Sequence, residues 1–210
     1  MKSKSMLVGA ALIAVFAISG CANNRELIVH SSHATRNDVF SEISSSEAAS
    51  GKAIADIMFT VKSNSSRFAE LYIKHSNPPY RIQVNIDEQA TVLEAEPIME
   101  NISPIDSNVP ESGAGWKYTF HKLLALAPGT HKLTITLPVD DVSVEREITL
   151  PVGVNTISVS PVYHKRFIRP FKSHNFTAGV ETLKILVNGV GVADVTQLHF
   201  LGEVAAVKKP

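Results

Sequence analysis

Four histidines are candidates for metal chemistry. His30 and His33 are three residues apart, a spacing that can place two ligands on one face of a helix, and His164 and His174 flank a basic stretch. The segment around His30 and His33 is polar, is not convincingly helical and supplies no third ligand nearby. We therefore expect no metal ion at these histidines.

Acidic residues offer a second candidate metal site. Asp140 and Asp141, together with Glu145 and Glu147, could supply the oxygen ligands that calcium prefers. The two aspartates lie between two predicted strands, however, where turn chemistry alone favours them. The expectation is a solvated turn, and we predict neither a metal ion nor another cofactor.

The short motifs of common catalytic sites are absent from the sequence. The chain has no Gly-x-Ser-x-Gly elbow, no glycine-rich phosphate loop, no Cys-x-x-Cys-His motif and only one cysteine. Serines and histidines are numerous enough for a triad assembled in space, with His121, His164 or His174 as its base. We expect no enzyme, and a hydrolase remains the alternative from another functional class.

The stretch Tyr163 to His174 combines positive charge with aromatic side chains. Its charge stands out because the whole chain is balanced, with 20 basic and 20 acidic residues. Such a stretch suits an anionic glycan, a lipid head group or an acidic protein surface. The alternative is an ordered connection in which Phe167 and Phe171 pack on the domain while the bases stay in water. The candidate binding residues are Lys165, Arg166, Phe167, Arg169, Phe171 and Lys172.

The N-terminus has the order of residues that is typical of an export signal. Two lysines precede an apolar run from Met6 to Ile18, which is too short to span a bilayer. The run leads into Ile18-Ser19-Gly20-Cys21, which resembles the lipobox of bacterial lipoproteins. The resemblance implies a signal peptide over 1–20, a lipid on Cys21 and, with Ala22 after the cysteine, the outer membrane. The alternative is that Cys21 is a small buried hydrophobe of an ordinary secreted protein.

Export also bears on charge and on the organisation of the chain. Removing residues 1–20 takes away two lysines and leaves 18 basic against 20 acidic residues, so a nucleic-acid partner is not expected. Residues 21–50 are serine-rich and too polar to bury much apolar surface, which predicts a tether. A short helix over 38–49 is the alternative there. The folded domain is expected over 51–205.

Alternating polar and apolar residues predict strands throughout that domain. The strand candidates are 54–61, 81–87, 117–126, 131–137, 142–150, 155–160 and 181–187. Pro161 is expected to end the sixth, and Asn188-Gly189 predicts a hairpin turn after the last. Residues 67–75 suit a strand or a helical turn, and residues 95–116 are expected to be a long loop. This pattern predicts an all-β fold, an antiparallel immunoglobulin-like or transthyretin-like sandwich.

The run Leu126-Ala127-Pro128-Gly129-Thr130-His131 continues into an alternating strand. It resembles the turn and strand of PEGA-like envelope modules over residues 82–163, with 95–116 as an insertion. Those modules open with an Asp-Gly turn, where this chain has Asp87-Glu88. The resemblance implies a structural or binding role. Because His131 shares a face with Leu133 and Ile135, we expect it to be packed and hydrogen-bonded to the backbone near Gly129.

Together these observations predict a lipid-anchored protein of the cell envelope with a non-enzymatic role in binding or assembly. Its expected partners are the membrane, through the lipid on Cys21, and an envelope protein or an anionic glycan or lipid. The alternative is an accessory lipoprotein subunit of an export or surface-structure complex, which would use the basic stretch for docking.

Overall fold

The computed structural model describes residues 34–45, 51–64, 80–103, 106, 108–168 and 171–192, with the backbone alone for 166–168 and 171–174. Among these residues no helix has the length and apolar character needed to cross a membrane. The elements are β1 (Phe40–Ile43), β2 (Ala53–Asn64), β3 (Arg81–Ile86), β4 (Gln89–Glu94), β5 (Ile98–Ile102), β6 (Gly113–Leu126), β7 (Gly129–Leu137), β8 (Val142–Leu150), β9 (Gly153–Tyr163), β10 (Lys165–Ile168), β11 (Phe171–His174), the 3₁₀ helix η3 (Phe176–Ala178), β12 (Val180–Val187) and β13 (Val190–Gly191).

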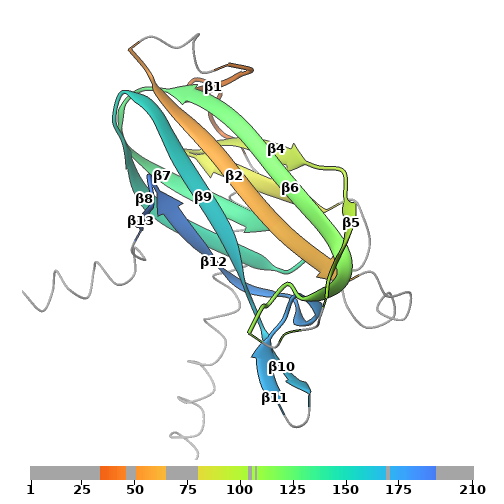
Figure 1. Ribbon diagram of the computed structural model, residues 1–210. Coiled ribbons are helices and arrows are strands. Elements are labelled where there is room, and N and C mark those ends of the chain that lie inside the picture. The colour runs from red at the N-terminus through yellow and green to blue at the C-terminus, as the bar shows by residue number, and fades with distance from the viewer. Residues whose placement is uncertain are drawn as a thin grey trace, which may run out of the picture.

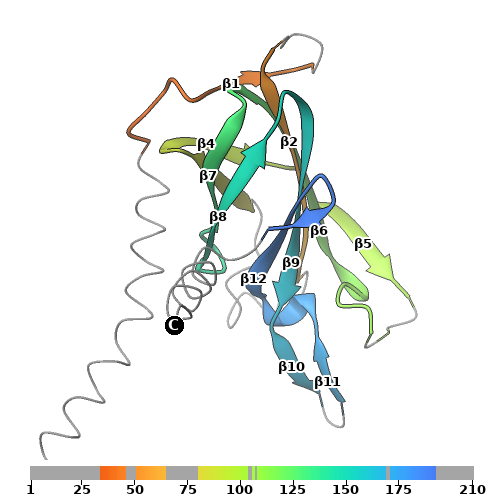
Figure 2. The same cartoon turned by 90° about the vertical axis from the view of Figure 1, so that its left-hand side faces the viewer.

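Two sheets form the body of the protein. The larger has the strand order β1-β6-β2-β9-β12-β13, with β5 also paired to β6, and the smaller has the order β4-β3-β7-β8. Figures 1 and 2 show them as two layers, with β10 and β11 as a separate ribbon that extends from one end. All pairs are antiparallel except β2 with β9. The predicted all-β sandwich is therefore confirmed, with one parallel pair in the larger sheet.

Alternation along the strands places one set of side chains between the sheets. From the larger sheet, Ile57 and Phe59 of β2 and Phe120 of β6 are buried, and the rings of Phe59 and Phe120 stack with centroids 5.9 Å apart. From the smaller sheet, Ile82 and Leu133 are buried. Each such side chain contributes about 1.5–3 kcal/mol through removal from water. The sandwich therefore has a substantial apolar core, which provides a stable base for the β10–β11 hairpin.

The hairpin turn predicted at Asn188-Gly189 is confirmed, and a second tight turn lies at Asp87-Glu88. Asp87 and Glu88, between β3 and β4, have φ of 46° and 72°, and Asn188 and Gly189, between β12 and β13, have φ of 51° and 81°. Positive φ at both central residues is the property of the tight turns that suit twisted hairpins. At the first turn a glutamate occupies the position where PEGA-like modules have glycine, and its N–H donates to Asn85 Oδ1 at 2.9 Å.

The expectation of a long loop over residues 95–116 is wrong in part. Ile98–Ile102 forms strand β5 and pairs with the first residues of β6, from Ile98 opposite Lys117 to Ile102 opposite Gly113. As an edge strand, β5 buries little on either face, so its sequence carries no strong alternation. Its pairing partner, rather than its own pattern, makes it a strand.

Part of the expected tether is also a strand. Residues Phe40 to Ile43 form β1, paired with β6 from Leu126 to Leu123, so the alternative of a helix over 38–49 is wrong for residues 38–45. Gln89 stabilises this segment. Its Oε1 accepts from the N–H groups of Val39 and Phe40 at 2.7 and 3.0 Å, and its Nε2 donates to Phe40 O at 3.0 Å. These bonds come from a residue about 50 positions away, which no local pattern reveals.

Pro161 does not end strand β9, contrary to expectation. The strand continues to Tyr163 with β12 on one side, while its pairing with β2 on the other side stops at Val159. A proline is tolerated where one side of a strand is open, because its missing N–H then breaks no ladder. Several other predictions fall outside the described residues: the signal peptide, Cys21, most of the tether and the ambiguous segment 67–75.

Candidate functional site

The basic stretch forms a hairpin that leaves the sandwich at the end of β9. Strands β10 and β11 pair antiparallel, with Lys165 opposite His174 and Phe167 opposite Lys172. Figures 1 and 2 show this hairpin projecting past the ends of β9 and β12. Lys165 is exposed. Arg169 lies outside the described residues, and so do the side chains of the other candidate residues. The alternative that Phe167 and Phe171 pack on the domain therefore falls outside the described part of the chain.

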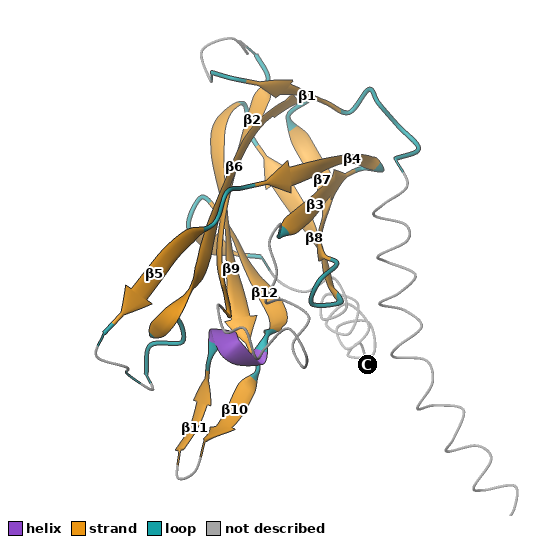
Figure 3. Ribbon diagram, turned by 90° about the vertical axis from the view of Figure 1, so that its right-hand side faces the viewer, coloured by secondary structure: helices purple, strands orange, loops and turns teal. Residues whose placement is uncertain are grey.

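The two ends of the hairpin are held by backbone hydrogen bonds. The N–H of His164 donates to Gly179 O at 2.8 Å, and the N–H of Asn175 donates to His164 O at 3.3 Å. The N–H of Phe176, in η3, donates to Pro110 O at 3.0 Å. Asn175 also caps η3 through its side chain, which accepts from Thr177 N at 3.0 Å. Figure 3 shows η3 at the base of the hairpin.

A buried lysine lies at this base. Lys62 of β2 is only 1% exposed. Its Nζ donates to Gly113 O at 2.7 Å, to Glu111 O at 2.8 Å and to Glu100 Oε2 at 3.2 Å. The ammonium also lies 5.1 Å from the centre of the Phe176 ring, a cation–π distance. A buried charge needs such compensation, so Lys62 ties β2, β5, the segment before β6 and η3 to one point.

Tyr163 links the same cluster to the hairpin. Its hydroxyl accepts from Lys62 N at 3.0 Å and donates to Glu111 Oε1 at 2.9 Å. Burial, with the charge of Glu111 adding to it, raises the pKa of Tyr163 above its ordinary value. The hydroxyl therefore stays protonated and keeps donating. Since Tyr163 is the last residue of β9, the hairpin begins from a fixed position.

Glu100 links the buried Lys62 to a partly exposed lysine, Lys117. Its carboxylate contacts Lys117 Nζ at 2.8 Å as well as Lys62 Nζ at 3.2 Å. The hydrogen bond from Lys117, followed by that from Lys62, lowers the pKa of Glu100. The carboxylate thus remains charged at neutral pH. Strand β5, which carries Glu100, is held to the same end of the sandwich as the hairpin (Figure 3).

Beside this base the surface has a notch of about 480 Å³. It is lined by Met58, Thr60, Ile102, Val109, Pro110, Glu111, Ser158, Val159, Ser160, Pro161 and Tyr163. The lining is mainly apolar, and it includes the hydroxyl-bearing residues Thr60, Ser158 and Ser160. Tyr163 belongs both to the notch and to the buried cluster, so the notch and the hairpin are neighbours.

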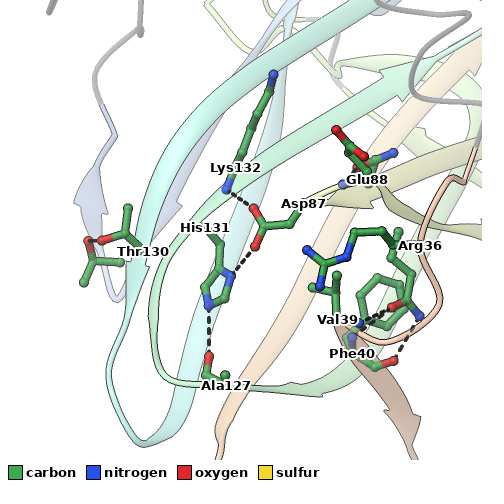
Figure 4. A network of polar contacts seen from close by, with 12 residues as sticks. Arg36, Val39, Phe40, Asp87, Glu88, Ala127, Thr130, His131 and Lys132 are labelled. Atoms are coloured by element: carbon green, nitrogen blue, oxygen red, sulfur yellow. Dashed lines mark hydrogen bonds and ion pairs between the residues drawn. The ribbon is translucent and has the colours of Figure 1, made fainter.

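His131 takes the structural role predicted for it. It is buried, and its Nε2 lies 2.9 Å from Ala127 O while its Nδ1 lies 2.7 Å from Asp87 Oδ2 (Figure 4). The other oxygen of Asp87 accepts from Lys132 N at 2.8 Å. The predicted bond to the backbone near Gly129 is confirmed, and the carboxylate of the tight turn is a second partner that the sequence did not indicate.

The other histidines with described side chains contact acids. His121 Nε2 lies 2.7 Å from Asp56 Oδ1, and His164 Nδ1 lies 3.9 Å from Glu181 Oε2. The described residues contain no group of three or more histidine, cysteine or acidic side chains placed to hold a metal ion. His30, His33 and the side chain of His174 lie outside that part of the chain.

Asp140 is more than a solvated turn residue. It lies in the turn between β7 and β8, as expected, but its Oδ2 accepts from the hydroxyl of Tyr80 and its Oδ1 accepts from Val180 N at 3.2 Å. Tyr80 is buried against Tyr118, with ring centroids 5.4 Å apart. The aspartate therefore helps to hold the start of β12, the strand that follows the hairpin base.

Sequence reasoning missed the residues that hold the hairpin. Lys62 follows a run of β-forming residues and reads as an ordinary polar strand end, and Glu111 lies in the segment taken as a loop. The resemblances to bacterial lipoproteins and to PEGA-like modules stay predictions. Comparisons with known protein families, with curated proteins and with solved structures find no match for this chain.

Proposed function

We propose that this protein is a lipid-anchored component of the cell envelope that binds an anionic partner through the β10–β11 hairpin and performs no catalysis. The observation that carries the proposal is the hairpin itself, which projects beyond the sandwich and is held at its base by buried side chains (Figure 2). A binding element whose base is already held in place loses less conformational entropy on association. The buried cluster at the base therefore favours a binding role for the hairpin over the role of a simple connection between two strands.

Charge indicates the kind of partner. The hairpin sequence carries Lys165, Arg166, Arg169 and Lys172 within eight positions, in a chain with equal numbers of acidic and basic residues. Concentrated positive charge on a projecting element raises the association rate and affinity for anionic surfaces. A subunit of an export or surface-structure complex, docked through the same hairpin, is the second form of this proposal.

Three substitutions in the hairpin test the proposal. We expect Arg166→Ser, Arg169→Ser and Lys172→Ser together to abolish capture of anionic envelope components at low salt, because the charges that attract them are gone. The melting temperature should stay within about 2 °C of wild type, because substitutions away from the buried contacts that stabilise a fold usually change stability by no more than about 0.5 kcal/mol. The measurement is affinity capture from solubilised envelope, read by mass spectrometry.

A matched variant controls for total charge. Lys52, Lys132 and Lys184 are exposed and lie outside the hairpin. Their replacement by serine removes the same charge and should leave capture unchanged. If the hairpin variant captures the same set of components as wild type, the hairpin is not the binding element.

The lipid anchor has its own test. The proposal supposes a diacylglyceryl group on Cys21, since a chain held by two or three acyl groups stays on a membrane. We expect Cys21→Ala to abolish incorporation of labelled palmitate and to move most of the protein out of the membrane fraction. An unchanged membrane fraction with no label on either form would rule out this anchor.

A further inference from the structure

The notch lies where two neighbouring strands separate. Strands β2 and β9 pair from Ala53 opposite Gly153 to Phe59 opposite Val159, and their pairing ends there. Beyond that point β2 stays with β6 as far as Asn64, and β9 stays with β12 as far as Tyr163. Figure 1 shows β9 continuing toward the hairpin while β2 runs to the other side. The notch is thus open on the face of the larger sheet, next to the root of the hairpin.

Its lining favours an apolar group. Met58 and Val109 are 44% and 39% exposed, and Ile102, Pro110 and Pro161 line the same space. Thr60, Ser158 and Ser160 also line it, and hydroxyl groups can pair with peptide N–H and C=O groups. The one carboxylate there, that of Glu111, already accepts from Tyr163. A volume of about 480 Å³ is within the usual range of ligand sites.

The distance from the notch to the positive charge is short. Tyr163 lines the notch and Lys165 follows two residues later. Two extended residues span at most about 7 Å, so an occupant of the notch has its next few groups beside the first base of the hairpin. Acidic groups next to the apolar group of such an occupant would therefore lie close to Lys165.

We propose that the partner is a protein segment that inserts an apolar side chain into the notch and places neighbouring acidic residues along the hairpin. This rests on the proposed function and names the class of partner for it. A glycan has no apolar side chain for Met58, Ile102 and Val109, and the surface of an anionic membrane presents charged head groups, which suit the hairpin but not the apolar lining of the notch. The notch thus contributes salt-independent affinity, and the hairpin contributes affinity that salt weakens.

Selection of displayed peptides against the full-length, detergent-solubilised protein tests this. A library of random 12-residue peptides should yield sequences with three or more acidic residues within about six positions of a large apolar residue. Enrichment of acidic residues without an apolar position, or no enrichment at all, would overturn the proposal. Binding to vesicles with and without anionic lipid is measured in parallel. If no peptide is enriched, and if the protein binds anionic vesicles equally well with and without the Met58→Glu substitution, the partner is a lipid surface and not a protein segment.

Two methionines give a matched pair of variants for the enriched peptides. Met58→Glu places a negative charge in the notch and should weaken binding more than tenfold at both low and high salt. Met99 on β5 is 49% exposed and does not line the notch, so Met99→Glu should bind as wild type does. If Met58→Glu binds the peptides as tightly as wild type does, the notch is not the site of the apolar contact, and the proposed function of the hairpin is unaffected. Equal binding by the hairpin variant contradicts the proposed function instead, so the two failures are distinguishable.

Discussion

Replacement of the buried lysine by methionine should lower the free energy of unfolding by about 2–4 kcal/mol. Lys62→Met shortens the side chain by one atom and removes the donor to Glu111 O and Gly113 O. Each buried acceptor left without a partner costs about 1–3 kcal/mol. The desolvation of the charge is relieved at the same time, and this offsets part of the loss. Urea titration followed by circular dichroism measures the difference.

The same change should loosen the base of the hairpin. The N–H groups of His164 and Phe176 donate to Gly179 O and Pro110 O, close to the site of substitution. We expect their hydrogen exchange to accelerate more than that of the central strands, because local opening then needs less free energy.

Lys117 is the matched control for Lys62. It contacts the same carboxylate of Glu100 at 2.8 Å but is partly exposed, with 34% of its side chain accessible. Lys117→Met should cost less than about 1 kcal/mol, as for other exposed ion pairs. If Lys62→Met and Lys117→Met have equal and small effects, the buried ammonium does not hold this end of the sandwich together.

Gly115→Ala is the second change for which a large loss is expected, about 2–3 kcal/mol. A Cβ on Gly115 would lie 2.6 Å from Ser63 O and 2.7 Å from Phe176 Cε2, well inside van der Waals contact. Ser63 O belongs to the backbone of β2 and cannot rotate away. Overpacking of this kind typically costs about 1–3 kcal/mol because strands must shift. Thermal unfolding measured by calorimetry gives the change in stability.

Gly191 controls for the intrinsic effect of adding a methyl group to a strand. The nearest atom to a Cβ there is Leu186 Cδ2, at 3.8 Å, an ordinary contact. Gly191→Ala should change stability by no more than about 0.5 kcal/mol. A similarly small effect at Gly115 would mean that β2, β6 and η3 are not closely packed at the base of the hairpin.

The strands and their turns were predictable because their signals are local. Alternation of polar and apolar residues over 131–137 and 142–150 is visible within a few residues, and the dipeptide Asn188-Gly189 by itself predicts a tight hairpin turn. His131 was predictable for the same reason, since its face is shared with Leu133 and its backbone partner, Ala127, is four residues away. The position of the basic stretch was visible as well, but its form as a projecting hairpin was not.

The tertiary structure alone decided which residues meet at the candidate site. Lys62 finds its acceptors 49 and 51 positions away, and its backbone N–H pairs with a tyrosine 101 positions away. Strands β1 and β5 exist because β6 offers them an edge, which neither segment encodes in its own pattern. The periodicity of a strand specifies which face is buried but not which distant strand covers it. The amino-acid sequence by itself therefore determined most of the strands of the sandwich and the positive charge of the basic stretch. Long-range packing determined β1, β5, the buried base of the hairpin and the notch beside it.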